Sequence, residues 1–442
     1  MTKIFIAEEI PSLNKGEEAI LYGFLETFKM LGDVEVSLFS LNPEVDRANY
    51  ANIRIINGMG DLHLLNNLQQ RSTFIKVLES TFALFQYLLF AIFCKVFGLN
   101  SVKIMKGEIW REYCKADLII IGHDGTFSSP FTQVLVFSHI CNIFLARLLR
   151  KPVVVYAGDA IYGAYIGIFK KKLWTILAKF LLNKVDLITL REEISYEYLQ
   201  KIGVSKLKIY VTADTAFLLK PAPEKRVREI MSQENINKNK EPIIGMTVTQ
   251  IMFRYAFPRL RNPKEKYESY IKLMAQVVDY LIDTLGATVA FLPHCIGTGN
   301  KLDDRIPAKD IFQMAKNKPK VKVIVNEYTA SELKGVIGQF DLFIGERAHS
   351  VISSTSMYVP SLSITFSLDP RTHGIIGKML GQEKWVYNIE KFDFNTLVSK
   401  INNLWLGREK AKRDLITKVD AVKKRAMLNG ELLKNLLRSD KR

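Results

Sequence analysis

The sequence predicts an α/β protein with two Rossmann-like lobes, a cleft between them and a helical C-terminal tail. Three observations support this fold class. The chain has 442 residues, which is more than a single hydrophobic core usually serves. Short β-rich runs alternate with helical patterns in two successive series, as parallel strands joined by crossover helices do. A charged, proline-bounded stretch, 221–242, separates the two series.

The first series predicts an N-terminal lobe over residues 1–220, with strands near 3–7, 34–39, 53–56, 117–122, 152–157, 186–190 and 208–211. Residues 221–242 are interpreted as the linker. The second series predicts a C-terminal lobe over 243–400, with strands near 243–248, 287–292, 321–325, 341–345 and 361–366. In such folds ligands bind at the carboxyl ends of the strands, where loops lead into helices.

A basic helical tail is predicted over 401–442, because apolar residues recur there at helical spacing.

The net charge is +17, from 62 Lys and Arg against 45 Asp and Glu. Two apolar stretches, 80–94 and 134–149, are too short to span a bilayer. Together with the charge they permit a peripheral contact with an anionic membrane, whereas packed core helices and a solvated basic surface are the simpler interpretation. Nucleic acid binding is not indicated, because no recognisable motif is present and aromatic residues are not interleaved with the basic clusters.

The four cysteines have neither CxxC spacing nor histidines at metal-ligand intervals, so we expect no metal site and no disulfide framework. This pattern fits a reducing cytoplasm.

Polar residues follow several of the predicted strands. Asn14, Gly16 and Glu17 form a loop that enters a helix, and such a loop presents N–H groups to an anion or a sugar hydroxyl, although capping of the helix explains it equally well. His123 and Asp124 lie in a loop with glycines on both sides, where His123 could bind a sugar hydroxyl or move a proton. A turn stabilised by Asp124 is the alternative.

Basic side chains dominate the other strand ends. Arg191 could clamp a carboxylate or phosphate, or else form an ion pair with Glu192 or Asp214. Arg347 and His349 enter a helix N-terminus together, an arrangement that suits an anionic substrate needing a proton donor. His294 and Arg371 end two further strands of the second lobe.

The motif order resembles the polysaccharide pyruvyl transferase family from about residue 3 to 390. The motifs are 14-NKGEEAI-20, 122-GHDGT-126, 185-VDLITLREEIS-195, 211-VTADTAF-217, 345-GERAHS-350 and 359-VPSLSI-364. The resemblance implies a glycosyltransferase B type fold, phosphoenolpyruvate as co-substrate, no other cofactor, and a glycan or lipid-linked oligosaccharide as acceptor. It also implies that Arg347, His349 and Arg191 bind the donor or act in catalysis. We expect Arg347 and His349 to be catalytic, and Arg191, Arg371, Ser195 and Ser350 to bind the donor. Asn14, Gly16, Glu17, His123, Asp124 and His294 are then expected to line the cleft or to bind the acceptor.

The expected function is therefore transfer of an enolpyruvyl group to a sugar of a cell-surface glycan or exopolysaccharide, giving a pyruvate ketal. Two alternatives remain at this stage. A glycosyltransferase that uses a nucleotide sugar can have the same fold, although residues 321–385 lack the paired glutamates at the spacing typical of retaining enzymes of that type. A non-catalytic glycan-binding protein would be expected to lack the Arg and His residues that this chain retains.

Overall fold

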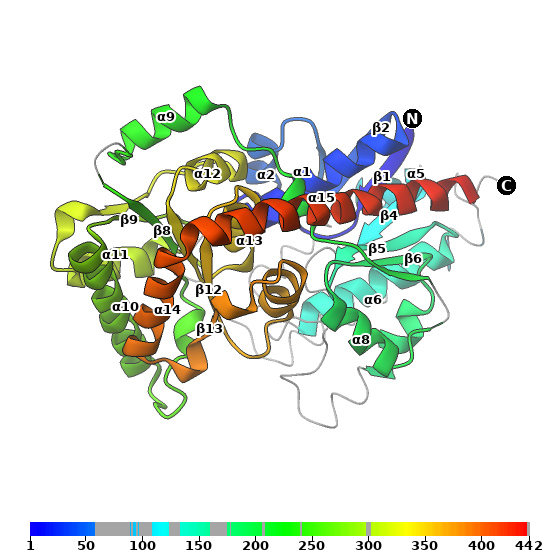
Figure 1. Cartoon of the computed structure of the whole chain (residues 1–442). Helices are drawn as coiled ribbons and strands as arrows, with labels where there is room; N and C mark the ends of the chain where they lie inside the picture. Colours follow the sequence, from blue (N-terminus) through cyan, green and yellow to red (C-terminus); the bar gives the residue numbers. More distant parts are fainter. Residues whose placement is uncertain are drawn as a thin grey trace. The chain divides into compact units, whose positions relative to one another are not determined.

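The computed structural model describes residues 1–57, 108–122, 133–159, 178–205, 208–238, 241–297 and 302–439, together with a few single positions between 89 and 176 (Figure 1). The chain divides into two compact units. Unit 1 contains Met1–Ser12, Phe24–Asp214 and Ala426–Arg442, and unit 2 contains Leu13–Gly23 and Thr215–Arg425.

Unit 1 is built on a seven-stranded parallel sheet with the order β3-β2-β1-β4-β5-β6-β7. Its strands are β1 (Thr2–Ile6), β2 (Val34–Ser40), β3 (Arg54–Asn57), β4 (Leu118–Ile121), β5 (Val153–Gly158), β6 (Leu187–Leu190) and β7 (Ile209–Val211). Its helices include α2 (Pro43–Asn49), α5 (Glu108–Lys115), α6 (Gln133–Leu148) and α8 (Glu193–Lys201). Alternate strand residues such as Phe5, Ile119 and Val153 join α5, α6 and α8 in one apolar cluster.

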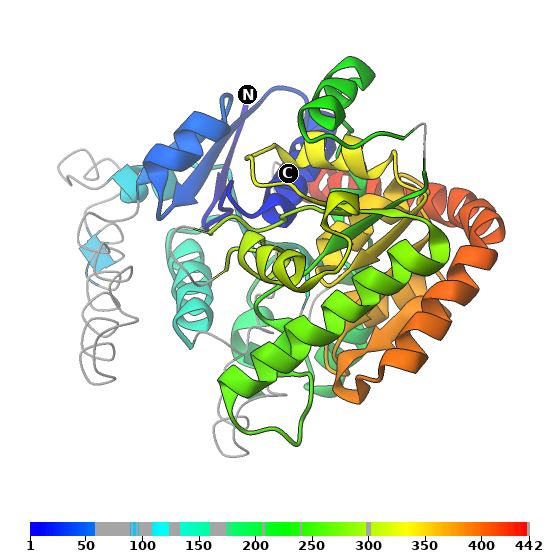
Figure 2. The same ribbon diagram turned by 90° about the vertical axis from the view of Figure 1, so that its left-hand side faces the viewer.

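Unit 2 repeats this architecture with six parallel strands in the order β10-β9-β8-β11-β12-β13. Its strands are β8 (Ile243–Thr247), β9 (Thr288–Phe291), β10 (Val321–Val323), β11 (Leu342–Gly345), β12 (Ser361–Thr365) and β13 (Val386–Asn388). Its helices include α9 (Glu224–Gln233), α10 (Pro263–Leu285), α11 (Arg305–Met314), α12 (Ala330–Ile337), α13 (Ala348–Ser356) and α14 (Phe394–Leu406). Helices α10, α11 and α14 share one core cluster with the sheet, and α10 runs beside α14 (Figure 2).

The sequence order reverses at one place in each sheet. In unit 1 the chain leaves β1 toward β2 and β3 and then returns to β4 on the other side of β1. In unit 2 the equivalent place lies between β8 and β11. Because the connections diverge there, the carboxyl ends of these strand pairs form the crevice in which ligands of open α/β sheets bind. We call these places the switch points of the two units.

The unit boundaries differ from the predicted domain limits. Residues 221–242, predicted to be the linker, contain α9, which packs against α12 within unit 2. Helix α1 (Lys15–Phe28) begins in unit 2 and ends in unit 1, and α15 (Arg408–Ser439) begins in unit 2 and ends in unit 1. Gly23 allows the α1 segment to lie against unit 2, since a Cβ there would come within 2.1 Å of the Thr215 carbonyl oxygen.

The tail is helical, as predicted, and its apolar residues Leu415, Val419 and Val422 are buried. Helix α6 falls on the predicted apolar stretch 134–149 and buries Ile143, Leu145 and Ala146. The other stretch, 80–94, lies almost wholly outside the described residues. Among the residues that the structure describes, no helix combines the length and the apolar character needed to cross a membrane. The membrane contact and the cytoplasmic location stay predictions.

Candidate functional site

Four strands of unit 2, β9, β8, β11 and β12, are neighbours in the sheet, and their carboxyl ends therefore meet at one edge. His294 follows β9, Arg347 and His349 follow β11, and Arg371 follows β12. The sequence predicts that six strand-end residues, these four together with His123 and Arg191, face one cleft. The structure brings the four residues of unit 2 to the same edge, around the switch point of that unit.

The Asp304 carboxylate forms hydrogen bonds with several groups at this edge. Its two carboxylate oxygens accept hydrogen bonds from Nε and Nη2 of Arg347, each at 2.7 Å. The Oδ2 atom also accepts the backbone N–H groups of His294 and Cys295, at 3.0 and 2.9 Å. The guanidinium is thus held in a fixed plane, and its Nη1 has no hydrogen-bond partner among the described residues. With 18% of its side chain exposed, Arg347 can still offer Nη1 to an anion.

The segment Leu13–Gly23 completes the edge from the N-terminal part of the chain. The Lys15 N–H donates to the His294 carbonyl at 2.8 Å, and Asn14 forms an antiparallel bridge with Cys295. Gly16 packs against the His349 ring so closely that a Cβ would lie 2.7 Å from Nδ1. The sequence predicts Asn14 and Gly16 as site residues, and the close contact of Gly16 with His349 within unit 2 explains why this residue is a glycine.

Lys15 adds a buried cation that the sequence analysis does not identify. Its side chain is 2% exposed, and its Nζ lies 3.2 Å from Glu18 and 3.4 Å from Glu327. The Glu18 carboxylate also accepts the N–H of Ala330, the first residue of α12, at 3.1 Å. Burial raises the pKa of Glu18, and Lys15 opposes this rise. Glu17, the neighbouring predicted residue, is buried as well.

His294 is a buried histidine at the same edge, and its pKa is strongly lowered. The residue is 2% exposed, and its Nδ1 has no hydrogen-bond partner within the described part of the chain. Its pKa is lowered to about 3, first by burial and then by the charges of Arg347, His349 and Lys15. His294 is therefore neutral at physiological pH, mainly because it is buried, and the neighbouring basic residues add to this effect.

Glu346 does not cancel this positive potential. It is buried, and it accepts the Tyr270 hydroxyl at 2.6 Å and the Thr249 N–H at 2.9 Å. Burial raises its pKa to about 8, so the carboxyl is largely protonated at neutral pH. Its bonds join the end of β11 to the end of β8 and to α10. The group next to Arg347 thus supports the site structurally without supplying a counter-charge.

The N-terminus of α13 lies at the same place. Arg347 is its N-cap, and the first N–H groups of a helix attract anions. Ser350 is fully buried, and its hydroxyl bonds Thr247 at 2.7 Å and the Arg347 carbonyl at 2.8 Å. The hydroxyl therefore fastens α13 to β8 and does not face a ligand in this structure, although the sequence predicts donor binding by Ser350.

Arg371 is held by Asp369 through Nε at 3.3 Å, and 35% of its side chain is exposed. Asp369 also accepts hydroxyl groups of Thr365 and Thr372. Burial works to raise the pKa of Asp369, but Arg371 and these hydroxyls together lower it. Arg371 lies near enough to act electrostatically on Arg347, so it adds a second guanidinium to the edge.

Arg191 is the clearest difference from the sequence-based expectation. It lies in unit 1 with no exposed surface, and it pairs with Asp159 at 2.5 Å and Asp214 at 3.0 Å. The ion pair with Asp214 is the alternative that the sequence left open. Ser195 is equally buried and bonds Glu192, the N-cap of α8. Both side chains are bonded to carboxylates inside the lobe.

The remaining predicted residues, His123 and Asp124, lie outside the described residues. Asp304, Lys15 and Tyr270 are the partners that sequence reasoning missed. They lie far from Arg347 in the sequence, and no local motif connects them with it.

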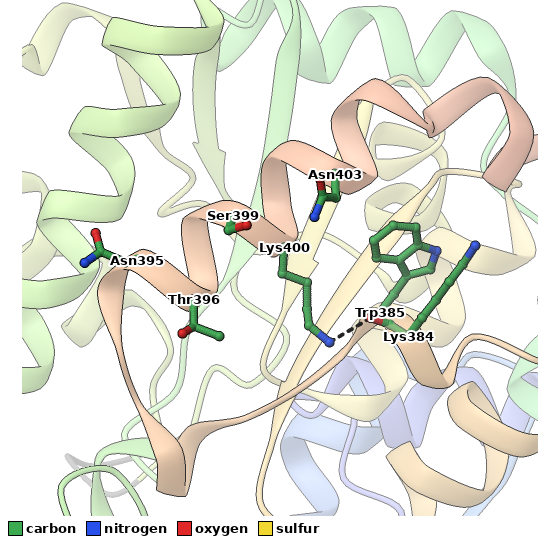
Figure 3. A pocket seen from close by; sticks show the side chains of 7 residues that line it. All are labelled: Lys384, Trp385, Asn395, Thr396, Ser399, Lys400 and Asn403. Carbon is green, nitrogen blue, oxygen red and sulfur yellow. Dashed lines mark hydrogen bonds between the residues drawn. The ribbon is translucent and has the colours of Figure 1, made fainter.

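A separate pocket of about 610 Å³ lies on unit 2 between the start of β13 and α14. Figure 3 shows its lining, in which Lys400 donates to the carbonyl oxygen of Lys384 at 2.7 Å. Lys384 and Trp385 precede β13, at the amino edge of the sheet. This pocket is therefore at the opposite edge from the cluster around Arg347, and it shares no residue with that cluster.

Comparison with known proteins gives three findings. The family model described as "Polysaccharide pyruvyl transferase" matches residues 14–367. The chain is similar to the amylovoran biosynthesis protein AmsJ of Erwinia amylovora, with 24% identity over 322 residues, or 72% of each chain. Among solved structures, it is similar to the UDP-GlcNAc 2-epimerase of Neisseria meningitidis (TM-score 0.57, 11% identity, 99% of this chain and 100% of that chain) and to HepE of Anabaena in complex with UDP (TM-score 0.54, 12% identity, 99% and 100%). At these identities the structural similarities show the fold alone, which is of the glycosyltransferase B type.

Proposed function

The chain belongs to the polysaccharide pyruvyl transferase family, and on this premise we propose that it transfers the enolpyruvyl group of phosphoenolpyruvate to a sugar, forming a pyruvate ketal. The acceptor in this proposal is a glycan of a polysaccharide pathway, free or lipid-linked. The similarity to a protein of amylovoran biosynthesis supports that class of acceptor.

The observation that carries the proposal is the positive potential at the carboxyl edge of unit 2. Phosphoenolpyruvate carries a carboxylate and a phosphate on one carbon atom, so it needs two neighbouring cationic contacts. Arg347 has Nη1 available beyond its bond with Asp304, and Arg371 lies close to it. The N-terminus of α13 adds backbone N–H groups. The pKa of His294 is lowered mainly by burial, and the charges of Arg347, His349 and Lys15 lower it further.

His349 is the proposed acid. Its ring packs on Gly16 beside Arg347, and an imidazolium there can protonate the methylene carbon of phosphoenolpyruvate. Protonation gives the carbon that bears the carboxylate an oxocarbenium-like character, while the fixed cations hold the carboxylate and stabilise the negative charge on the departing phosphate. A first sugar hydroxyl adds to this carbon and loses its proton. The C–O bond to phosphate then breaks, and a second hydroxyl adds and loses its proton to close the ketal.

The protons balance in this scheme. One proton enters at the methylene carbon, and two leave from the sugar hydroxyls. One of these two replaces the proton given by His349, and the other leaves with phosphate as hydrogen phosphate. Arg347 and Arg371 act through charge only, because a guanidinium stays protonated throughout.

The test is phosphate release from phosphoenolpyruvate in the presence of a glycan acceptor. Arg347→Ala and His349→Ala are each expected to lower kcat/KM by about 10²–10³-fold, the usual loss when a group that stabilises developing charge is removed. Arg347→Ala should also weaken binding of phosphoenolpyruvate, which a thermal-shift titration measures. Lys400→Ala, in the pocket of Figure 3, is the matched control and should retain activity.

Near-normal turnover in both variants would contradict the proposed site. In the same titration, stabilisation by a nucleotide sugar and not by phosphoenolpyruvate would favour a glycosyltransferase instead.

A further inference from the structure

Unit 1 carries several large apolar side chains on its surface. Phe144 of α6 is 44% exposed, and Phe180, in the helical segment that precedes β6, is 60% exposed. Ile176 lies one turn before Phe180 and is 58% exposed. Single apolar residues scattered over a surface need no explanation, but apolar residues gathered on one face mark an interaction site. The topology of the sheet places these three residues on one face.

Two neighbouring helices of unit 1 carry them. Strands β4, β5 and β6 are adjacent and parallel, α6 connects the first two, and the helical residues 178–182 lie in the connection between the last two. Right-handed crossovers between parallel strands place both helices on the same side of the sheet. Each helix contributes its inner face to one apolar cluster, through Ile143, Leu145 and Ala146 and through Ala178, Leu181 and Leu182. Phe144, Ile176 and Phe180 therefore lie on the outer face of this layer.

Basic side chains accompany the apolar ones on the outer face. Arg147 lies one turn beyond Phe144 on α6, and its side chain is 45% exposed although it pairs with Asp186. Lys184 follows Phe180 by four residues, and its Nζ lies 5.4 Å from the centroid of the Phe180 ring. The lysine chain thus runs beside the aromatic ring and carries its charge at the end, as basic residues at a boundary between apolar and polar surroundings do.

Acidic side chains are rare near this face. In the sequence from 125 to 185 the only acidic residue is Asp159, which is buried. Asp186, the next carboxylate along the chain, accepts hydrogen bonds from Arg147 and from the Val153 N–H. The outer face therefore combines exposed apolar side chains with a positive charge that acidic residues offset only at Arg147.

An anionic bilayer is the partner that fits this combination. Aromatic and aliphatic side chains insert at the level of the lipid headgroups, and lysine and arginine side chains extend from there to the lipid phosphates. The net charge of +17 adds a long-range attraction to such a surface. A second copy of the chain fits less well, because two copies that met through this face would bring like charges together.

We propose that the outer face of α6 and of residues 178–182 binds anionic lipid membranes peripherally, with Phe144, Ile176 and Phe180 at the level of the headgroups. We call this surface the lipid face. Helix α6 then has two roles, since its inner side packs on the sheet and its outer side contacts lipid. These are the two interpretations that the sequence offers as alternatives for the stretch 134–149. All of these residues belong to unit 1, so lipid binding does not depend on the proposed activity of unit 2.

The experiment is flotation of the full chain with vesicles of phosphatidylcholine and phosphatidylglycerol in equal amounts, compared with vesicles of phosphatidylcholine alone. The unmodified protein should float with the mixed vesicles at low salt and much less at high salt, because salt screens the headgroup charge. Phe144→Ser and Phe180→Ser should each lower the partition coefficient by about tenfold, since each removes an apolar ring that lipid covers. Lys184→Gln should lower it by about fivefold, at low salt only.

Two substitutions in unit 2 are the matched controls. Leu406→Ser also removes an exposed apolar side chain, because Leu406 at the end of α14 is 73% exposed. Lys264→Gln removes an exposed lysine of α10. Both variants should bind the mixed vesicles as the unmodified protein does. Every substituted residue is exposed, and thermal melting verifies that each variant is folded.

Three outcomes would overturn the inference. Failure of the unmodified protein to float with the mixed vesicles at low salt would show that the lipid face does not bind lipid. Unchanged flotation of a variant with both Phe144→Ser and Phe180→Ser would place the membrane contact on another surface. Dimers that Phe180→Ser dissociates, without flotation of the unmodified protein, would make this face an interface between two copies. The assay contains neither phosphoenolpyruvate nor acceptor, so its result is separate from the test of the proposed function.

Discussion

Arg191 of unit 1 and Arg347 of unit 2 occupy equivalent positions in their folds, since each follows a parallel strand and precedes a helix. Their surroundings differ. Arg191 is sealed between two carboxylates, Asp159 and Asp214, with no exposed surface. Arg347 is bound by one carboxylate, Asp304, and keeps 18% of its side chain exposed. The charge of Arg191 is neutralised by carboxylates inside its lobe. Arg347 retains positive charge and one N–H donor group that can bind a ligand.

The comparison shows that an arginine at a strand end is not by itself a binding residue. What decides its role is the number of carboxylates that the tertiary structure brings to it. Burying a guanidinium costs desolvation free energy, which its attraction to buried carboxylates must offset. Two carboxylates around one guanidinium offset this cost, but they also occupy the hydrogen-bond donors that a ligand would need. A single carboxylate orients the guanidinium and leaves it open.

The largest expected effect that separates the two arginines is on stability. Arg191→Met leaves two buried carboxylates without a counter-charge, and it should lower the free energy of unfolding by about 3–5 kcal/mol. Arg347→Met should cost clearly less, because Asp304 retains two backbone N–H donors and the site is partly exposed. Urea denaturation of both variants measures the difference.

If the two variants lose similar stability, the contrast between a structural and a ligand-binding arginine does not hold. If Arg191→Met is stable but unable to bind phosphoenolpyruvate, donor binding by Arg191, as the family resemblance implies, would be supported instead.

Much of the fold follows from local patterns. The run 243–248 predicts β8 and the run 117–122 predicts β4, because buried parallel strands are short and continuously apolar. Helix α9 is not predicted from the sequence, because its segment is highly charged and flanked by prolines. The helical spacing of three buried residues nevertheless indicates a helix there: Val227, Ile230 and Met231. The spacing of these three residues therefore predicts the helix better than the composition of the segment does.

The site follows from the sequence only in part. Topology brings strand-end residues such as His294 and Arg347 to one edge, so their meeting is predictable. The partners that set their chemistry are not predictable, because Asp304 and Lys15 reach the site through tertiary contacts between distant segments. The same limit applies to Arg191, whose burial depends on Asp159, a residue on a different strand end.

A substitution of Gly16 tests the role of the unit 2 edge without removing a charge, and its expected effect is smaller. In Gly16→Ala the new Cβ would lie 2.7 Å from His349 Nδ1 and 2.8 Å from its Cβ and Cγ, so the imidazole must shift. We expect a loss of about tenfold in kcat, since misplacement of a catalytic group by a fraction of an ångström is costly. Steady-state phosphate release measures it.

Gly377→Ala is the matched control for Gly16→Ala. Gly377 lies in the π-helix Thr372–Met379 of unit 2, and a Cβ there meets no atom closer than 3.4 Å. Its kcat should be unchanged. Equal kcat values in the two alanine variants would mean that the His349 ring position does not matter for turnover.

The smallest expected effect concerns the glutamates beside the two arginines. Burial raises the pKa of Glu346 to about 8 and that of Glu192 to about 7. A carboxyl whose pKa is higher in the folded than in the unfolded state keeps its proton on folding, so its stabilising contribution is complete below about pH 4.5 and is lost as the pH rises through the folded value. Each group should therefore make the stability fall with rising pH, by at most about 1.4 kcal/mol per pH unit.

Glu346→Gln removes the titrating carboxyl. The free energy of unfolding of the variant should therefore fall less between pH 5 and pH 8 than that of the unmodified protein. Glu192→Gln should flatten a range that ends about one pH unit lower. Chemical denaturation at a series of pH values measures both, with Glu268→Gln, an exposed position on α10, as the control. An unchanged pH dependence in Glu346→Gln would mean that Glu346 is ionised when folded. The charge of Arg347 would then be cancelled by two carboxylates, as that of Arg191 is, and the contrast between the two lobes would disappear.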